Sequence, residues 1–301
     1  MVSFRMLSQY IGYLLLLFMI TLFKSLGKQR SSNIASYFFC ILGPLTKFQS
    51  RAKKNIKYVW PNKTDKDTKF ILKKMWSNVG RNFGEFVFFR KYDPLKDIST
   101  EIYGKDTLNK IISINKKKGK GIIFFSGHYG NWELAPVVLG SLGLKILTIY
   151  RKSNNQYINN FIQTIRENFA HYTPKGDKGA KQSFLWLRKG KSLALAMDQK
   201  LNEGKVVDFL GKKSNTASAI AELSVRMDLD IVPIKIVRKE HLNFVSFCSK
   251  LEKPNKNMSH EEKVIFILEK INTTLTTWIE EKPDQWFWIH RRWDKKLYKN
   301  N

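Results

Sequence analysis

GIIFFSGHYGNWELAPVVLGSL, residues 121–142, joins two kinds of secondary structure across a glycine-rich turn. Gly121–Ser126 is a short apolar run with the composition of a strand, and Asn131–Leu142 has the composition of a helix. Gly127 and Gly130 flank the turn between them, and glycine tolerates backbone conformations that other residues adopt rarely. The stretch therefore predicts a strand–turn–helix unit.

The same alternation continues along the chain. The predicted strands are Lys145–Tyr150, Ser192–Met197 and Ile231–Val237, and the predicted helices are Gln156–Phe169, Ala180–Arg188, Thr216–Met227 and Met258–Glu281. Before the quoted stretch, Thr64–Arg90 has apolar residues at helical spacing, and Asn109–Lys118 has the pattern of a basic helix end. Strands that alternate with helices predict an α/β fold with a mostly parallel sheet flanked by helices.

The N-terminal region has a different character. Tyr10–Phe23 is uncharged and would form a helix of about 21 Å, shorter than the ~30 Å hydrocarbon core of a bilayer. A second apolar stretch, Ile34–Leu45, follows it. We expect a retained anchor, either one short span or a helix pair that lies in the interface. A signal peptide fits less well because no small-residue cleavage site follows, and a buried helix of a soluble protein is the remaining alternative.

Charge gives both an orientation and a class of partner. Lys24, Lys28 and Arg30 follow the first apolar run, whereas Arg5 alone precedes it, so the positive-inside rule places the body of the protein in the cytoplasm. The chain of 301 residues has 53 Lys+Arg against 25 Asp+Glu, a net charge of +28. Such a field attracts anionic partners, unless the lysines only reflect a biased composition. With 43% hydrophobic residues, the chain is not disordered.

His128 is the residue best suited to proton transfer. It follows Gly127 directly after a predicted strand, and histidine exchanges a proton near neutral pH. Glu133 stands five positions later, about 140° away on an ideal helix, so the two side chains could meet only if His128 lies in the turn. A carboxylate at the far ring nitrogen would fix the tautomer. We therefore predict that Glu133 orients His128 as a general base; the alternative is a structural histidine.

Two further polar residues, Arg151 and Asp198, also come just past the ends of predicted strands. In parallel sheets, sites lie beyond the carboxyl ends of the strands, so these residues and His128 should gather at one edge. The sequence has no G-x-S-x-G elbow, which suggests that a substrate hydroxyl is itself the nucleophile.

Metal and nucleotide chemistry have little support. The five histidines form no metal-binding spacing, and Cys40 and Cys248 are far apart, as expected for a reducing compartment. The sequence contains neither a Walker A motif nor G-x-G-x-x-G. We expect no metal and no cofactor.

The segment SGHYGNWE, residues 126–133, resembles the H-x4-D/E motif of the bacterial lipid A late acyltransferases, the lauroyl and myristoyl transferases of lipopolysaccharide biosynthesis. Many members of that family have Asp where this chain has Glu133. The other blocks that resemble the family are NIKYVWPN (55–62), MWSNVGRNFGEF (75–86), YRKSNNQYINNFIQTIR (150–166), MDQKLNEGKVVDFLGKKSNTASAIAEL (197–223) and PDQWFWIHRRW (283–293).

The resemblance implies a glycerolipid-acyltransferase-like fold and transfer of a fatty acyl chain from acyl-acyl carrier protein. The acceptor would be a hydroxyl of an anionic glycolipid, the lipid A precursor (Kdo-lipid IVA or an acylated form). Residues 1–48 would anchor the protein to the inner membrane, and residues 49–301 would form a catalytic domain that faces the cytoplasm.

The resemblance also implies residue roles. His128 would be the base and Glu133 its partner, while Arg166 and Arg151 would contact phosphate or the developing oxyanion. Asp198 and Gln199 would support the pocket. The alternating tryptophans and basic residues of 286–293 would form either a strand-like platform for a membrane interface or part of the core.

Three other functions remain open from the sequence. The acceptor could be a glycerophospholipid or another glycolipid rather than lipid A. A basic nucleic-acid-binding protein is a remote alternative, because no RRM, KH or helix-turn-helix pattern is present. A non-catalytic membrane scaffold is the third.

Overall fold

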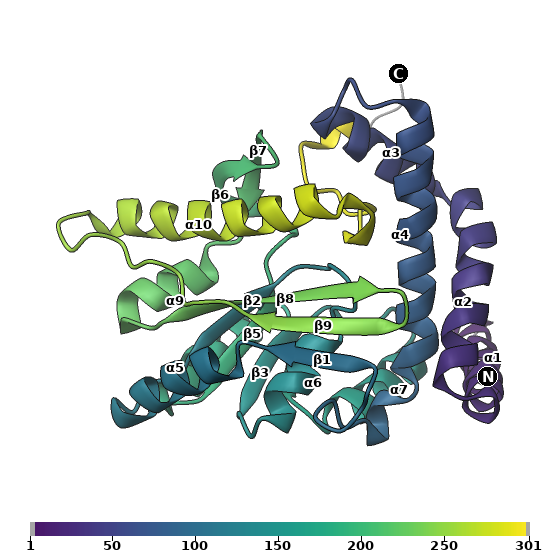
Figure 1. The fold of residues 1–301 in the computed structure, drawn as a ribbon, viewed down its shortest axis with the longest axis horizontal. Coiled ribbons are helices and arrows are strands. Elements are labelled where there is room, and N and C mark those ends of the chain that lie inside the picture. The colour runs from purple at the N-terminus through teal and green to yellow at the C-terminus, as the bar shows by residue number, and fades with distance from the viewer. Residues whose placement is uncertain (1–3, 299–301) are drawn as a thin grey trace.

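A seven-stranded sheet organises the computed structural model, which describes residues 4–298 (Figure 1). The strands are β1 (Thr100–Tyr103), β2 (Ile123–Ser126), β3 (Ile146–Tyr150), β4 (His171–Pro174), β5 (Ser192–Ala196), β6 (Lys200–Phe209), β7 (Lys212–Thr216), β8 (Ile231–Lys239) and β9 (Leu242–Phe247). The sheet order is β1-β9-β8-β2-β5-β3-β4, and every neighbouring pair is parallel except β8 with β9. Strands β6 and β7 form a separate antiparallel hairpin.

Helices cover both faces of the sheet. They are α1 (Phe4–Leu26), α2 (Lys28–Leu42), α3 (Lys47–Val59), α4 (Asp65–Phe86), α5 (Lys105–Lys117), α6 (Leu134–Ser141), α7 (Gln156–Arg166), α8 (Asp177–Arg188), α9 (Ala219–Met227) and α10 (His260–Glu281). Short 3₁₀ helices lie at Gly43–Leu45, Phe89–Lys91, Pro283–Gln285 and Lys295–Tyr298. In Figure 1, α10 runs along one face and α5 and α6 lie on the other. The predicted α/β fold with a mostly parallel sheet is confirmed.

The central strand β2 separates two hydrophobic clusters. Ile123 and Phe125 pack in the cluster under α10, whereas Phe124 packs in the cluster that contains α6 residues such as Val138. Successive side chains of a strand point to opposite faces, so an unbroken apolar run buries itself on both. This double burial fixes the end of β2, and therefore the start of the turn that carries His128.

Several elements differ from the prediction. Strands β1, β4, β6, β7 and β9 were not expected, because they are short or rich in polar residues. The predicted helix from Thr216 begins instead at Ala219, since Thr216 is the last residue of β7. The helix predicted from Asn131 begins at Leu134, which lengthens the turn after β2.

Two glycines let α2 and α4 approach closely, as their parallel course in Figure 1 shows. A Cβ on Gly80 would lie 2.4 Å from the carbonyl oxygen of Ala35, and one on Gly84 would lie 2.5 Å from that of Ser31. Both distances are shorter than any van der Waals contact. The glycines therefore set the spacing between the N-terminal helices and the sheet-bearing part of the protein.

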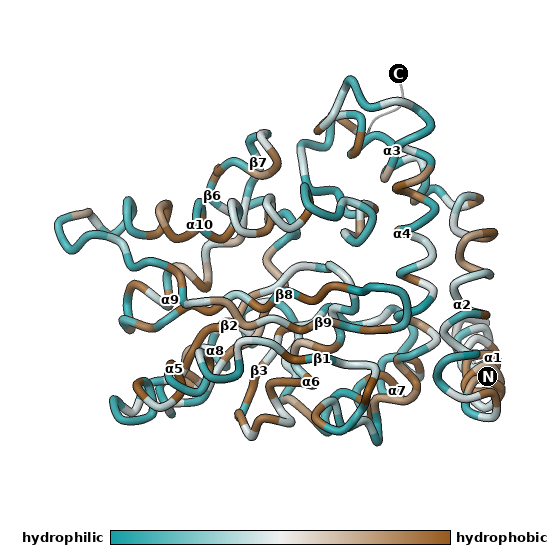
Figure 2. The backbone as a smooth tube through the Cα atoms, in the orientation of Figure 1, coloured by the Kyte–Doolittle hydropathy of each residue, from teal (hydrophilic) through white to brown (hydrophobic). Residues whose placement is uncertain are grey.

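Apolar residues are concentrated in the strands and along α1 (Figure 2). By length and composition, α1 could cross a membrane over Met6–Leu26. Unlike the core helices, it buries little of its surface.

The substitution Gly84→Ala should lower the free energy of unfolding by about 1–3 kcal/mol, because the added methyl group meets backbone that cannot move away cheaply. The matched control is Gly12→Ala in α1, where the nearest atom to a new Cβ lies 3.6 Å away. That change should be neutral or stabilise by up to about 1 kcal/mol through helix propensity. Denaturant unfolding in detergent measures both, and equal effects would contradict the close packing.

Candidate functional site

The turn after β2 places His128 at the carboxyl end of the sheet. Gly130, two residues later, has φ +56°, and a Cβ there would lie 2.2 Å from the carbonyl oxygen of Ile236. Both facts restrict this position to glycine. The backbone N–H of Gly130 also donates to the carbonyl of Gln285, at 3.0 Å. The turn is thus held against β8 and the C-terminal segment.

The carboxylate that touches the His128 ring belongs to Asp198. His128 Nδ1 lies 2.8 Å from Asp198 Oδ1, and the backbone N–H of His128 donates to Oδ2 at 2.8 Å. Trp286 Nε1 donates to the same Oδ2, also at 2.8 Å. Asp198 is fully buried and follows β5, the strand that pairs with β2. Adjacent parallel strands therefore bring the base candidate and its carboxylate together.

Glu133 makes a different contact. Its carboxylate accepts hydrogen bonds from Arg166 Nε, at 3.1 Å, and from Arg166 Nη2. The predicted contact between Glu133 and His128 is therefore wrong. The physical reason is local: Glu133 directly precedes α6, and there its side chain meets the last residue of α7. Both side chains of this ion pair are mostly buried.

The charges of the site support one another. Burial lowers the pKa of His128, whereas the charge and hydrogen bond of Asp198 raise it. The effect of Asp198 is the stronger one, so the net pKa lies above the ordinary histidine value. Burial raises the pKa of Asp198, yet the charge and hydrogen bond of His128 hold it well below the usual range. Asp198 therefore stays ionised although it is buried.

A second imidazole lies beside the first. The ring centroids of His128 and His290 are 4.7 Å apart, and burial lowers the pKa of His290 to about 3. Trp132 and Phe287 also approach the His128 ring, with centroids at 5.5 and 6.5 Å. Candidate metal-binding atoms of His128, Asp198 and His290 lie within 4.8 Å of one another, but the first two residues already bond to each other.

The remaining predicted site residues differ in their placement. Gln199 Nε2 lies 3.4 Å from His128 Nε2, so it contacts the ring nitrogen that faces away from Asp198. Arg151 is exposed after β3, and within residues 4–298 no hydrogen bond, ion pair or ring contact joins it to His128. The segment 286–293 is irregular rather than a strand, and Trp286 and Trp288 are at most 1% exposed. Of the two roles considered for these tryptophans, the structure supports core packing.

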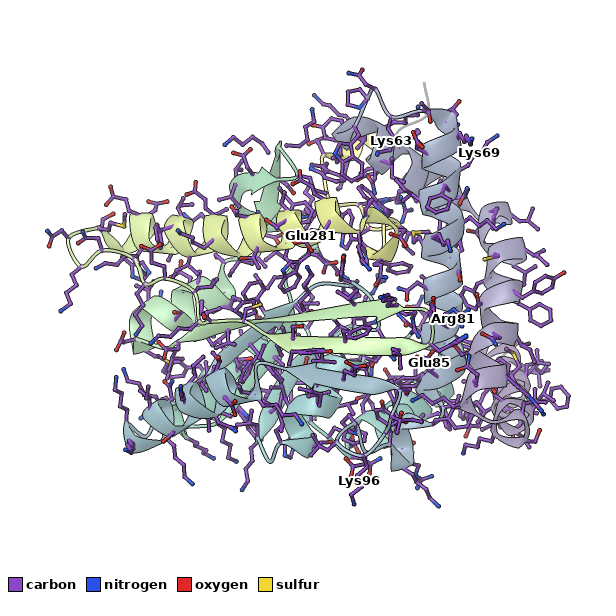
Figure 3. The ribbon with its side chains drawn as sticks, in the orientation of Figure 1. Lys63, Lys69, Arg81, Glu85, Lys96 and Glu281 are labelled. Carbon is purple, nitrogen blue, oxygen red and sulfur yellow. The ribbon has the colours of Figure 1, made fainter. Side chains whose placement is uncertain are left out.

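Sequence reasoning missed a buried polar network on the other side of the turn. Arg238 in β8 donates to Glu85 at 2.7 and 2.9 Å, and to Asn78 and Asn82 in α4 at 2.8 and 2.7 Å. Both asparagines donate to the carbonyl of Gly130, at 2.9 and 2.8 Å. Figure 3 shows Glu85 on α4 where that helix passes the sheet.

The same network includes one residue of the turn after β2 and one residue of α2. Asn131 in the turn and Ser32 in α2 donate to Glu85, at 2.8 and 2.7 Å. A signal was present in the sequence: Asn78, Asn82 and Glu85 recur at helical spacing on the same face of α4 as the apolar residues Ile71 and Met75.

The change Glu85→Gln should destabilise the protein by about 3–5 kcal/mol, because it leaves the Arg238 charge buried without its partner. Both side chains of this pair are at most 6% exposed. The control is Asp208→Asn, which breaks an exposed ion pair with Lys213 and should change stability by less than about 1 kcal/mol. Chemical denaturation measures the free energy of unfolding of both variants. If Glu85→Gln lowered it by no more than Asp208→Asn, the network would not hold the turn.

Residues 1–295 match the family described as bacterial lipid A biosynthesis acyltransferase. A comparison with curated proteins found no match. The match extends over nearly the whole chain and includes the turn with His128, the segment with Asp198 and the C-terminal tryptophans. The chain therefore belongs to the bacterial lipid A biosynthesis acyltransferase family.

Proposed function

We propose that the protein transfers a fatty acyl chain from acyl-acyl carrier protein to a hydroxyl of a lipid A precursor, such as Kdo-lipid IVA. In this proposal His128 is the general base and Asp198 holds its ring. The observation that supports it best is the 2.8 Å contact between His128 Nδ1 and the buried Asp198 carboxylate. That contact leaves Nε2 as the nitrogen able to accept a proton.

The reaction would proceed by direct attack. His128 Nε2 takes the proton of the acceptor hydroxyl as its oxygen bonds to the thioester carbonyl carbon. When the tetrahedral intermediate collapses, the carbon–sulfur bond breaks and the imidazolium returns the proton to the departing sulfur. The ester and the free thiol are the products, and the base is regenerated. Holding the hydroxyl and the thioester together would supply much of the rate.

Arg166 is the proposed anion-binding group, and Glu133 its positioning residue. Glu133 holds the guanidinium through two hydrogen bonds, so Arg166 would meet a phosphate or oxyanion already oriented. Burial lowers the pKa of Arg166, but the charge and hydrogen bonds of Glu133 raise it by more. The guanidinium therefore stays charged. Gln199, which contacts His128 Nε2, would guide the hydroxyl. Arg151, which is exposed, would contact a more distant acceptor phosphate.

Net charge and helix α1 support the proposed donor and the proposed location. A protein of net charge +28 would attract both an acidic carrier protein and a phosphorylated glycolipid. The exposed apolar helix α1 favours a place at the inner membrane, with the catalytic part on the cytoplasmic side.

The direct test is acyl transfer by purified full-length protein, with acyl-acyl carrier protein as donor and Kdo-lipid IVA or lysophosphatidate as acceptor. His128→Ala should reduce transfer to the glycolipid by roughly 10²–10⁴-fold, because the general base is lost. His260→Ala, which removes an exposed histidine bonded to Glu222, should leave the rate within about twofold. Transfer only to lysophosphatidate, or full activity of His128→Ala, would refute the proposal.

The pH dependence separates Asp198 from Glu133. Because only neutral imidazole accepts a proton, wild-type kcat should rise as pH increases through the His128 pKa. Asp198→Asn removes the charge that raises this pKa, so the midpoint should move to lower pH while kcat falls at every pH. Glu133→Gln should move the midpoint less and raise KM for the acceptor. If Glu133→Gln moved the midpoint more than Asp198→Asn did, Glu133 and not Asp198 would be the partner of His128. Circular dichroism checks that both variants fold.

A further inference from the structure

One face of α1 contacts the rest of the protein near both of its ends. Near its start, Gln9 Nε2 donates to the carbonyl of Asn154 at 3.0 Å, and Asn155 Nδ2 donates to the carbonyl of Gln9 at 2.7 Å. Tyr13 stacks on Tyr157 of α7, with ring centroids 5.8 Å apart. These contacts tie the N-terminal half of α1 to the loop after β3 and to the first turn of α7.

The other end of α1 is equally fixed. Phe23 is 4% exposed and packs edge-on against Phe83 of α4, with centroids 6.2 Å apart. Its carbonyl accepts a hydrogen bond from Ser31 Oγ, at 2.7 Å. Gln9 and Phe23 are separated by about 21 Å along a helix that rises 1.5 Å per residue. Contacts over that length mean that α1 lies along the protein and does not project from it.

The opposite face of α1 is apolar and exposed. Its exposed large side chains are Met6, Leu7, Ile11, Leu14, Leu15, Phe18, Met19 and Leu22, and Tyr10, half exposed, borders the docked face with its ring 5.5 Å from that of Tyr157. Further exposed apolar residues lie on α2 (Tyr37, Phe38, Ile41 and Leu42), at Leu45, and on the loop beside the start of α2 (Leu95 and Ile98). Figure 1 shows α1 and α2 together on one flank of the molecule. An apolar surface of this extent marks a partner or a membrane.

Of a protein partner and a membrane, the charged residues around this apolar surface favour a membrane. Lys24 and Arg30 are exposed where α1 meets α2, and Lys96 is exposed on the neighbouring loop. Cations around an apolar surface suit the anionic headgroups of a bilayer. No acidic residue occurs in α1 or α2.

A spanning orientation conflicts with the docking contacts. Placing Gln9 across the bilayer from Phe23 would carry the loop at Asn154 and Asn155 through the hydrocarbon, where irregular backbone exposed to lipid is not tolerated. We propose that α1 lies in the plane of the interface, with its outer face in the lipid, and does not cross the bilayer. This inference rests on the proposed membrane location and specifies how the protein is held there.

An α1 that lies in the interface would also place the proposed anion site near the membrane. Helix α7, on which α1 is docked, ends at Arg166, the residue paired with Glu133. A flat α1 would therefore hold the wall of the proposed anion site beside the headgroups. A lipid acceptor could then reach His128 without leaving the membrane completely.

Spin labels on the outer face of α1 test the orientation. Full-length protein with Cys40→Ser and Cys248→Ser is labelled at one of Leu7→Cys, Leu14→Cys, Phe18→Cys or Ser25→Cys, and bound to vesicles of zwitterionic and anionic phospholipid. Collision with oxygen and with a water-soluble nickel complex gives the depth of each label. The control label at Val206→Cys lies on the exposed β6–β7 hairpin and should remain in water.

The proposal predicts one depth for all four labels, about 5–10 Å below the headgroup boundary. A profile that is deepest at Leu14 and Phe18 and shallow at both ends would show a spanning helix and overturn the inference, while leaving the acyl transfer reaction untouched. Failure of the unlabelled protein to sediment with vesicles would overturn the membrane location itself. The acyl transfer assay with detergent-dispersed acceptor reports separately on the proposed reaction.

Discussion

A buried, ionised carboxylate is the constraint around which the site is arranged. Asp198 is withdrawn from water, so its charge must be balanced by donors: the ring and backbone N–H of His128 and the indole N–H of Trp286. Removing a partner from such a group costs several kcal/mol. The same three bonds hold the end of β2, the end of β5 and the C-terminal segment together. The position of the proposed base therefore depends on the same contacts that pack these parts of the fold.

The turn after β2 is held from its other side as well. Gly130 accepts hydrogen bonds from Asn78 and Asn82, and these asparagines are fixed by Arg238, which pairs with Glu85. The turn after β2 is therefore held by two buried charged groups, Asp198 on one side and the Arg238–Glu85 pair on the other. Since Ser32 of α2 also donates to Glu85, the N-terminal helices are connected to the turn through the same network. We infer that the N-terminal helices and the proposed base keep a fixed position relative to each other.

The sequence predicted the parts of the structure that depend on local pattern. Apolar runs identified β2, β3, β5 and β8, and helical spacing identified α4, α7 and α10. It did not reveal the partner of His128, because Glu133 is close in sequence whereas Asp198 is 70 residues away and arrives only through the pairing of β5 with β2. Asp198 was expected to support the pocket, but its contact with the ring needed the sheet order. The polar strand β6 gave no apolar pattern to detect.

The most direct measurement is the titration of His128 by NMR in protein labelled with ¹⁵N-histidine. We expect the neutral ring to carry its proton on Nδ1 and its pKa to exceed the ordinary value of about 6.5. We also expect Asp198→Asn to lower this pKa more than Glu133→Gln does. A neutral ring protonated on Nε2, or a pKa that responds to Glu133→Gln and not to Asp198→Asn, would contradict these expectations.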